Sequence, residues 1–100
     1  MTTEEKEVLT KQAEMMISMS ESLERLEKNQ DFLNVINNYL QNEPLKLTFT
    51  LASANKEERD SAKECLIGIA RFGAYLHNIK MLKEHGKKQL EDLEKEEVVE

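Results

Sequence analysis

The chain has 100 residues, of which 34% are charged and 5% are aromatic, and its formal net charge is −6 at pH 7. A chain of this length forms one domain at most, and its richness in Glu, Lys and Gln with little Gly or Pro favours helices over sheets or disorder. The acidic balance argues against direct binding to nucleic acid or to anionic lipid, whose phosphates are bound by Lys and Arg.

Other features of the composition point to a reducing compartment. Cys65 is the single cysteine, which excludes an intrachain disulfide. The first residues, MTTEEKEV, are acidic, whereas a secretory signal peptide begins with a basic region. No apolar run approaches the roughly 18 residues of a membrane span. We therefore expect a cytoplasmic protein that has no contact with a membrane.

The first predicted element is a long, coiled-coil-like helix over residues 1–30. Thr2 followed by Glu5 is a capping box, which marks its start. Heptad spacing joins eight positions, six of them apolar: Leu9, Gln12, Met16, Met19, Leu23, Leu26, Gln30 and Leu33. The apolar centre of this row predicts a helix–helix seam. Its four side chains are Met16, Met19, Leu23 and Leu26.

Two short helices are expected over residues 31–54, after a bend near residues 29–31. Asp31 is the predicted cap of the first, and Pro44 separates the two, because the residue before a proline avoids helical dihedrals. Residues 45–52 alternate apolar and polar side chains, as in a strand. A lone strand would have to pair between subunits, whereas Pro44 suits the first turn of a helix. We predict the helix.

The main helix is predicted over residues 55–85, with Asn55 as N-cap. Apolar residues recur along it at spacings of three and four: Ala62, Cys65, Ile69, Phe72, Leu76 and Ile79. This stripe predicts a core-facing helix in which Cys65 is buried and inert. Gly86 suits the left-handed position that ends a helix.

Residues 86–100 are expected to form an acidic, poorly anchored helical tail. Leu90 and Leu93 continue the apolar register of the main helix into it. A helix that ran unbroken over residues 56–93 would span about 57 Å. A compact domain of this size has a radius of gyration of only roughly 13 Å. Such a helix would need a partner, which predicts a homo-oligomer or a complex with another protein.

Small residues on the main helix indicate close packing. They are Gly68, Ala70, Gly73 and Ala74. Glycine costs about 1 kcal/mol inside a helix, so close approach of another helix is the preferred interpretation, with a ligand as the alternative.

The sequence offers no convincing catalytic or metal site. His77 and His85 are eight residues apart, whereas two histidines that bind one metal on a helix are four apart. Cys65 and His77 would lie roughly 18 Å apart along the same helix, too far for a nucleophile and its base. We therefore expect no enzyme, no metal and no cofactor.

The segments DFLNVINNYLQNE and LASANKEERDSAKECLIGIARFGAYL, within residues 31–79, resemble short all-helical accessory proteins of tailed bacteriophages. The resemblance lies in helical pattern and implies a virion component or an assembly helper. It assigns a function to no individual residue. If the chain is encoded by a phage, the host cytoplasm or the virion would be its location.

Taken together, the sequence predicts a single all-α domain over residues 1–100 with a long N-terminal helix, two short central helices and a long C-terminal helix. We expect a non-enzymatic structural or assembly protein that oligomerises through helical seams. The alternative is a small acidic regulator that binds a host or viral protein. The residues expected at the core and interaction seam are Met16, Met19, Leu23, Leu26, Cys65, Ile69, Phe72, Leu76 and Ile79.

Overall fold

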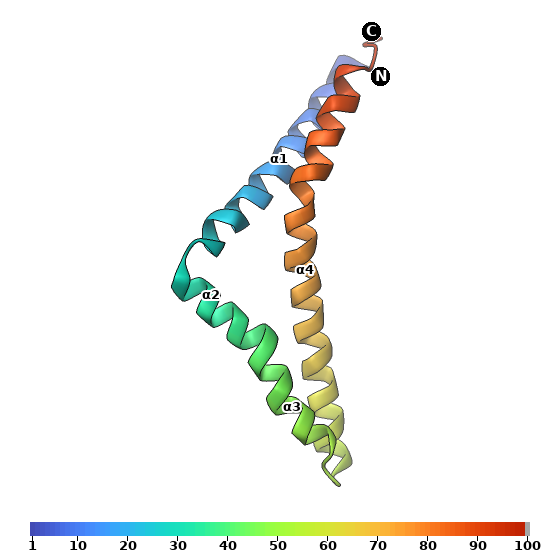
Figure 1. Ribbon diagram of the computed structural model, residues 1–100. Coiled ribbons are helices and arrows are strands. Elements are labelled where there is room, and N and C mark those ends of the chain that lie inside the picture. Colours follow the sequence, from blue (N-terminus) through green and yellow to red (C-terminus); the bar gives the residue numbers. More distant parts are fainter. Residues whose placement is uncertain (100) are drawn as a thin grey trace. The chain divides into compact units, whose positions relative to one another are not determined.

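The computed structural model describes residues 1–99, and all of the regular structure in that range is helical (Figure 1). The elements are α1 (Thr3–Glu27), α2 (Gln30–Asn37), the π-helical turn η1 (Asn38–Asn42), α3 (Glu43–Leu51) and α4 (Lys56–Glu94). The prediction of an all-α fold is confirmed.

The helices form two compact units, and α4 contributes to both. Unit 1 contains residues 1–25 and the chain from Asn78 onward, and unit 2 contains Leu26–His77. Helix α1 therefore packs with the later part of α4, whereas α2, η1 and α3 belong with its earlier part. The prediction of one domain over residues 1–100 stays a prediction.

The starts of the two long helices follow the predicted capping residues. The backbone N–H of Glu5 donates to Thr2 Oγ1 at 3.1 Å, and the backbone N–H of Thr2 donates to Glu5 Oε2 at 3.4 Å. At α4, the backbone N–H of Glu58 donates to Asn55 Oδ1 at 3.2 Å. Both caps are confirmed, and each satisfies N–H groups that the first helical turn leaves without a helical acceptor.

The break between α1 and α2 lies where it was expected, but its capping residue is different. Asn29 has extended backbone dihedrals, and its side chain accepts a 3.0 Å hydrogen bond from the backbone N–H of Phe32. The prediction of Asp31 as the cap was wrong. Asp31 lies in the first turn of α2, where its negative charge complements the helix dipole.

The central segment is one helical path instead of two separate short helices. Pro44 lies in the first turn of α3, which follows η1 directly. In a regular helix its ring would clash with the carbonyl four residues earlier. The π-helical turn widens the path at this point, and the backbone N–H of Glu43 donates to the Asn38 carbonyl. Residues 45–51 are helical, so the helix prediction is confirmed and the strand is excluded.

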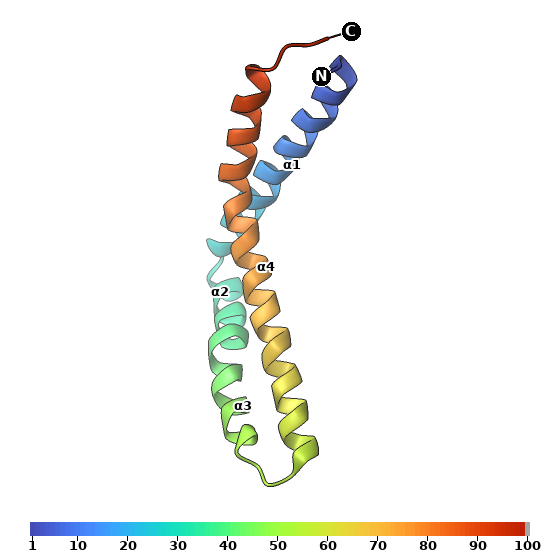
Figure 2. The same cartoon turned by 90° about the vertical axis from the view of Figure 1, so that its right-hand side faces the viewer.

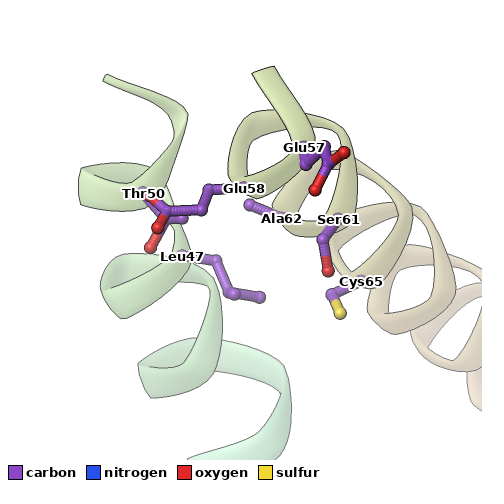
Figure 3. Close-up of a pocket in the computed structure, with 7 residues that line it drawn as sticks. All are labelled: Leu47, Thr50, Glu57, Glu58, Ser61, Ala62 and Cys65. Carbon is purple, nitrogen blue, oxygen red and sulfur yellow. The ribbon is translucent and has the colours of Figure 1, made fainter. Parts of the chain in front are cut away.

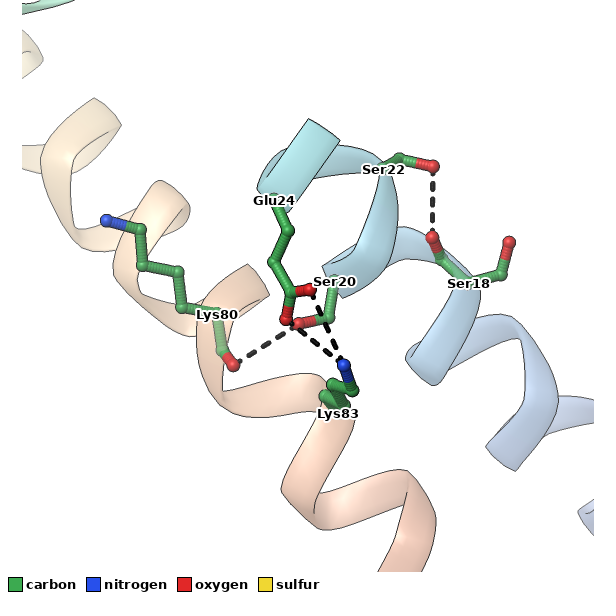
Figure 4. A network of polar contacts seen from close by, with 6 residues as sticks. All are labelled: Ser18, Ser20, Ser22, Glu24, Lys80 and Lys83. Carbon is green, nitrogen blue, oxygen red and sulfur yellow. Dashed lines mark hydrogen bonds and ion pairs between the residues drawn. The ribbon is translucent and has the colours of Figure 1, made fainter. Parts of the chain in front are cut away.

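In unit 1, α1 runs antiparallel to the later part of α4. The Ser20 hydroxyl donates to the Lys80 carbonyl at 3.3 Å, and Lys83 Nζ lies 3.3 Å from Glu24 Oε1 (Figure 4). Towards the other end of the pair, Gln89 Nε2 donates to the Leu9 carbonyl at 2.8 Å. Ser20 is the most deeply buried polar side chain here, and its hydrogen bond offsets the cost of removing the hydroxyl from water.

The residues of α1 that face α4 are only partly those of the predicted seam. At every second site of the seam, the next residue along the chain faces α4 instead. Leu23 is buried and Met16 is half-buried, as expected, but Met19 and Leu26 are 50% and 49% exposed. Their places are taken by Ser20, which is buried, and Glu27, which is half-buried. Both rows have three-four spacing, so periodicity alone could not separate them.

Gly86 explains why the small residues of α1 face inward. It lies inside α4, which continues to Glu94, and no glycine in the described residues has a positive φ, so the prediction that Gly86 ends the main helix was wrong. A Cβ at this position would lie 2.7 Å from the Ala13 carbonyl oxygen and 2.8 Å from Ile17 Cγ1. The glycine therefore allows the two helix backbones to approach closely.

In unit 2, the path from α2 to α3 converges on the earlier part of α4 towards the α3–α4 connection (Figures 1 and 2). Ala62 and Ile69 are buried between the helices. Around them lie half-buried side chains of α4: Leu66, Phe72 and Leu76. The Phe72 ring meets the Tyr39 ring edge-to-face, with centroids 5.7 Å apart. The predicted stripe of α4 thus faces its partner helices at most of its positions.

The close contact at Gly86 generates a prediction about stability. Gly86→Ala should lower the free energy of unfolding by about 1–3 kcal/mol, because overpacking against Ala13 outweighs the roughly 1 kcal/mol gain in helix propensity. Gly73→Ala is the matched control, since a Cβ there would make only an ordinary 3.5 Å contact with Leu40 Cδ2. Chemical denaturation should show the control unchanged or stabilised. A stabilised Gly86→Ala variant would contradict the close approach.

Candidate interaction surface

Unit 2 leaves large apolar side chains in contact with water. Val35 is 67% exposed, Phe49 83% and Tyr75 56%, and Leu45 and Tyr39 are also exposed. In the same unit, Ala62 and Ile69 are the buried hydrophobic residues among those the structure describes. A single exposed apolar residue is ordinary on a protein surface, but several on one small helical unit indicate a contact surface.

A groove runs along one face of unit 2, between α4 and the path from α2 to α3. It consists of two adjoining hollows of about 490 and 340 Å³, which share Leu47 and Cys65. Figure 3 shows Leu47 of α3 and Cys65 of α4 on opposite sides of the smaller hollow. The larger hollow is lined by Val35 and Tyr39, so two of the exposed apolar side chains border the groove directly.

Cys65 is exposed, and the prediction that it is buried was wrong. Its neighbour Leu66 is half-buried and takes the place in the row between Ala62 and Ile69 that was assigned to the cysteine. Both choices fit three-four spacing, but the larger leucine removes more apolar area from water when it faces the partner helices.

The exposed cysteine belongs to a second stripe on α4, next to the buried one. We call it the exposed stripe and define it by five residues at spacings of four, three, four and three: Ser61, Cys65, Gly68, Phe72 and Tyr75. Four of them are exposed, and Phe72 is half-buried at the border with the packed side chains. This is heptad spacing, which places its members on one line along the helix. A Cβ at Gly68 would meet nothing within 4 Å, so this part of the stripe is open space.

The opposite face of unit 2 also carries a hollow, of about 380 Å³. Leu40 and Pro44 line it from one side, and Leu66 and Gly73 from α4. These side chains are half-buried, whereas Val35 and Tyr39 beside the groove are exposed. The groove is therefore distinguished by the exposed large apolar side chains beside it, whereas the lining of the opposite hollow is apolar but largely covered.

The residues predicted for the core and interaction seam divide into three groups. The buried ones are Leu23, Ile69 and Ile79. The half-buried ones are Met16, Phe72 and Leu76, and the exposed ones are Met19, Leu26 and Cys65. Their role in binding another protein stays a prediction.

Sequence reasoning missed the contacts of Ala13, Ser20 and Gly86. The only signal for these contacts in the sequence is the small size of the three residues.

Carboxylates lie along the groove, two near the α3–α4 connection and one at the start of α3. Glu57 and Glu58 line the smaller hollow, and Glu43 lines the larger one. Glu58 accepts a 2.6 Å hydrogen bond from the Ser53 hydroxyl, and Glu43 Oε1 lies 3.3 Å from Lys46 Nζ. The Ser53–Glu58 hydrogen bond holds the chain around the connection, and the Glu43–Lys46 pair lies within the first turn of α3, so two of the three carboxylates have a local partner.

No other chemistry converges on this surface. Within residues 1–99, no three His, Cys, Asp or Glu side chains lie close enough together to hold a metal ion. None of the helices in that range has an apolar stretch long enough to cross a membrane. No protein family matches the chain, and no curated protein and no solved structure matches it. The surface is therefore interpreted from its own residues.

The exposure of Cys65 generates a prediction about thiol reactivity. In dilute native protein, a thiol reagent should label Cys65 nearly as fast as it labels the unfolded chain, because the sulfur is accessible. The matched control moves the only cysteine to a buried position with the substitutions Cys65→Ser and Ile69→Cys, and should react slowly. Equally slow labelling of Cys65 would contradict the exposed position.

Proposed function

We propose that the protein is a non-enzymatic assembly protein that acts through helix–helix association of its own copies. The observation that carries the proposal is the groove of unit 2, where Val35 and Tyr39 are exposed beside the open space at Gly68. Tyr75 is exposed two helical turns further along α4. Apolar side chains next to a hollow on a helical face are what a second helix fills when it packs.

The energy available from covering this surface is substantial. An aromatic side chain has about 150–250 Å² to bury. Covering the exposed half of Tyr75 would thus remove about 100 Å² from water, which contributes roughly 2.5 kcal/mol at 25 cal/mol per Å². Several such side chains together can offset the loss of freedom on association, which is estimated at 4–15 kcal/mol or more.

The setting that we propose is a bacteriophage particle or its assembly in the host cell. The segments that resemble phage accessory proteins lie within residues 31–79, and the groove lies between α4 and the path from α2 to α3 in the same part of the chain. In this setting, repeated helix–helix contacts would join copies of the chain to one another or to other virion proteins. The groove supports the contact, and the resemblance supports the setting.

A second candidate function is that of a small acidic regulator that binds a host or viral protein. The observation that favours it is the carboxylates that line the groove, Glu43, Glu57 and Glu58, beside apolar side chains. An amphipathic helix with basic residues along its edges would match that combination. The two functions differ in whether the occupant of the groove is the chain itself.

The oligomeric state tests the first function directly. At micromolar concentrations, light scattering should give a mass of at least twice the 11.6 kDa of the chain, and the mass should fall on dilution. Substituting Val35→Glu, at an exposed position beside the groove, should lower the mass while leaving the helical circular dichroism intact. The control is Gln41→Glu, which adds the same charge at an exposed position of η1 that lines neither hollow. A folded monomer at every concentration would contradict self-association.

A further inference from the structure

We propose that two copies associate through the exposed stripe of α4, with the two α4 helices antiparallel and a twofold axis between Cys65 and Gly68. The result is a four-helix bundle of two unit-2 hairpins. This inference rests on the proposed function, since it names the partner as a second copy and fixes its orientation. It is carried by the order of side-chain sizes along the stripe and by the charges beside it.

Side-chain sizes along the exposed stripe run from small to large. Ser61, Cys65 and Gly68 are small, whereas Phe72 and Tyr75 are aromatic. An antiparallel copy reads the stripe in reverse, so that Ser61 of one copy faces Phe72 of the other and Cys65 faces Gly68. Small therefore meets large at Ser61 and Phe72, and small meets small at the axis, where the helices approach most closely. Tyr75 lies beyond the paired part of the stripe, opposite Glu58 of the other copy.

Gly68 is well placed to lie near the axis. Glycine inside a helix costs about 1 kcal/mol relative to alanine, and at Gly86 a close contact with Ala13 accounts for that cost. At Gly68, no other part of the chain lies within 4 Å of the Cβ position. If a second helix packs against this backbone, Gly68 allows its close approach, just as Gly86 allows the close approach of α1.

Charges beside the stripe agree with the antiparallel orientation. Glu64 and Arg71 each precede a stripe residue by one position and lie on the same side of the stripe. Both are exposed, and neither forms an ion pair within the part of the chain that the structure describes. With the axis between Cys65 and Gly68, Glu64 of each copy lies beside Arg71 of the other. Flanking charges of this kind set the orientation of paired helices.

A parallel pair of the same helices fits poorly. Each stripe residue would face its own copy, so Gly68 would face Gly68 while Phe72 would face Phe72. The backbones would be held apart by the aromatic end and left without contact at the small end. The other side of the stripe holds Ala62, Ile69 and Leu76, so Glu64 and Arg71 would have no opposite charge beside them. Size and charge both favour the antiparallel pair.

The area of the face sets the upper limit for the interface of such a dimer. The path from α2 to α3 covers residues 30–51, about 33 Å of helix at 1.5 Å per residue. Two helices side by side, with axes 8–10 Å apart, are about 18–20 Å wide. The face therefore measures roughly 600 Å² per copy, or roughly 1,200 Å² in total, the lower limit for specific interfaces. A dimer of this size should dissociate on dilution.

Charge reversal tests the orientation in the full-length chain. Glu64→Arg places like charges opposite one another in a homodimer, and so does Arg71→Glu. Each variant should weaken self-association about tenfold, because two ion pairs become two repulsions. Mixing the two variants should restore dimers, since Arg at position 64 of one chain then faces Glu at position 71 of the other. Both positions are exposed, so circular dichroism should show unchanged helicity.

The outcomes separate this inference from the proposed function. Heterodimers that form on mixing, measured by sedimentation velocity with one variant fluorescently labelled, would support the antiparallel pair. An oligomeric wild-type chain whose two variants associate as well as it does would overturn the antiparallel pair and leave self-association standing. A monomeric wild-type chain would overturn both, and binding of a basic amphipathic peptide to that monomer would favour the regulator instead.

Discussion

The contact between α4 and the shorter helices is the interaction on which the structure depends. Residues 78–94 of α4 pack against α1, and residues 56–77 pack with the path from α2 to α3. Ile69 in one unit and Ile79 in the other are buried on this helix. Each unit is thin, because it consists of helices packed in a single layer. A single layer has two open faces, so the choice of side chains on those faces decides what the protein can bind.

Side-chain size decides which stripe of α4 faces inward and which remains available. In unit 2, Leu66 turns inward and Cys65 outward, because the leucine has more apolar area to remove from water. In unit 1, Ser20 turns inward and Met19 outward, and the short serine side chain donates a 3.3 Å hydrogen bond to the Lys80 carbonyl of α4. In unit 2, the inward position of Leu66 leaves the exposed stripe on the surface of α4. This stripe supplies the apolar and small residues on which the proposed association depends.

Much of the fold could be predicted from local rules. The caps at Thr2 and Asn55 and the break near Asn29 depend on a few neighbouring residues, and such signals can be read from sequence. The position of Cys65 and the role of Gly86 could not be predicted, because three-four spacing is compatible with two neighbouring stripes and a glycine can either end a helix or admit another. Contacts from elsewhere in the chain settle both choices.

The candidate surface was only partly predictable. The small residues of α4 indicated close packing, but the exposure of Val35 and Tyr75 depends on tertiary structure.

Cross-linking across the proposed axis tests the antiparallel association most directly. In a Cys65→Ser background, one chain carries Glu64→Cys and a second carries Arg71→Cys, and a short bifunctional thiol reagent is added to each alone and to the mixture. The account predicts covalent dimers in the mixture and little cross-linking in either chain alone. Across the axis, positions 64 and 71 of opposite copies are offset by about 3 Å along the helices, whereas equivalent residues are offset by about 7.5 Å at position 64 and about 13.5 Å at position 71. Efficient cross-linking of either chain alone, with no gain on mixing, would contradict it.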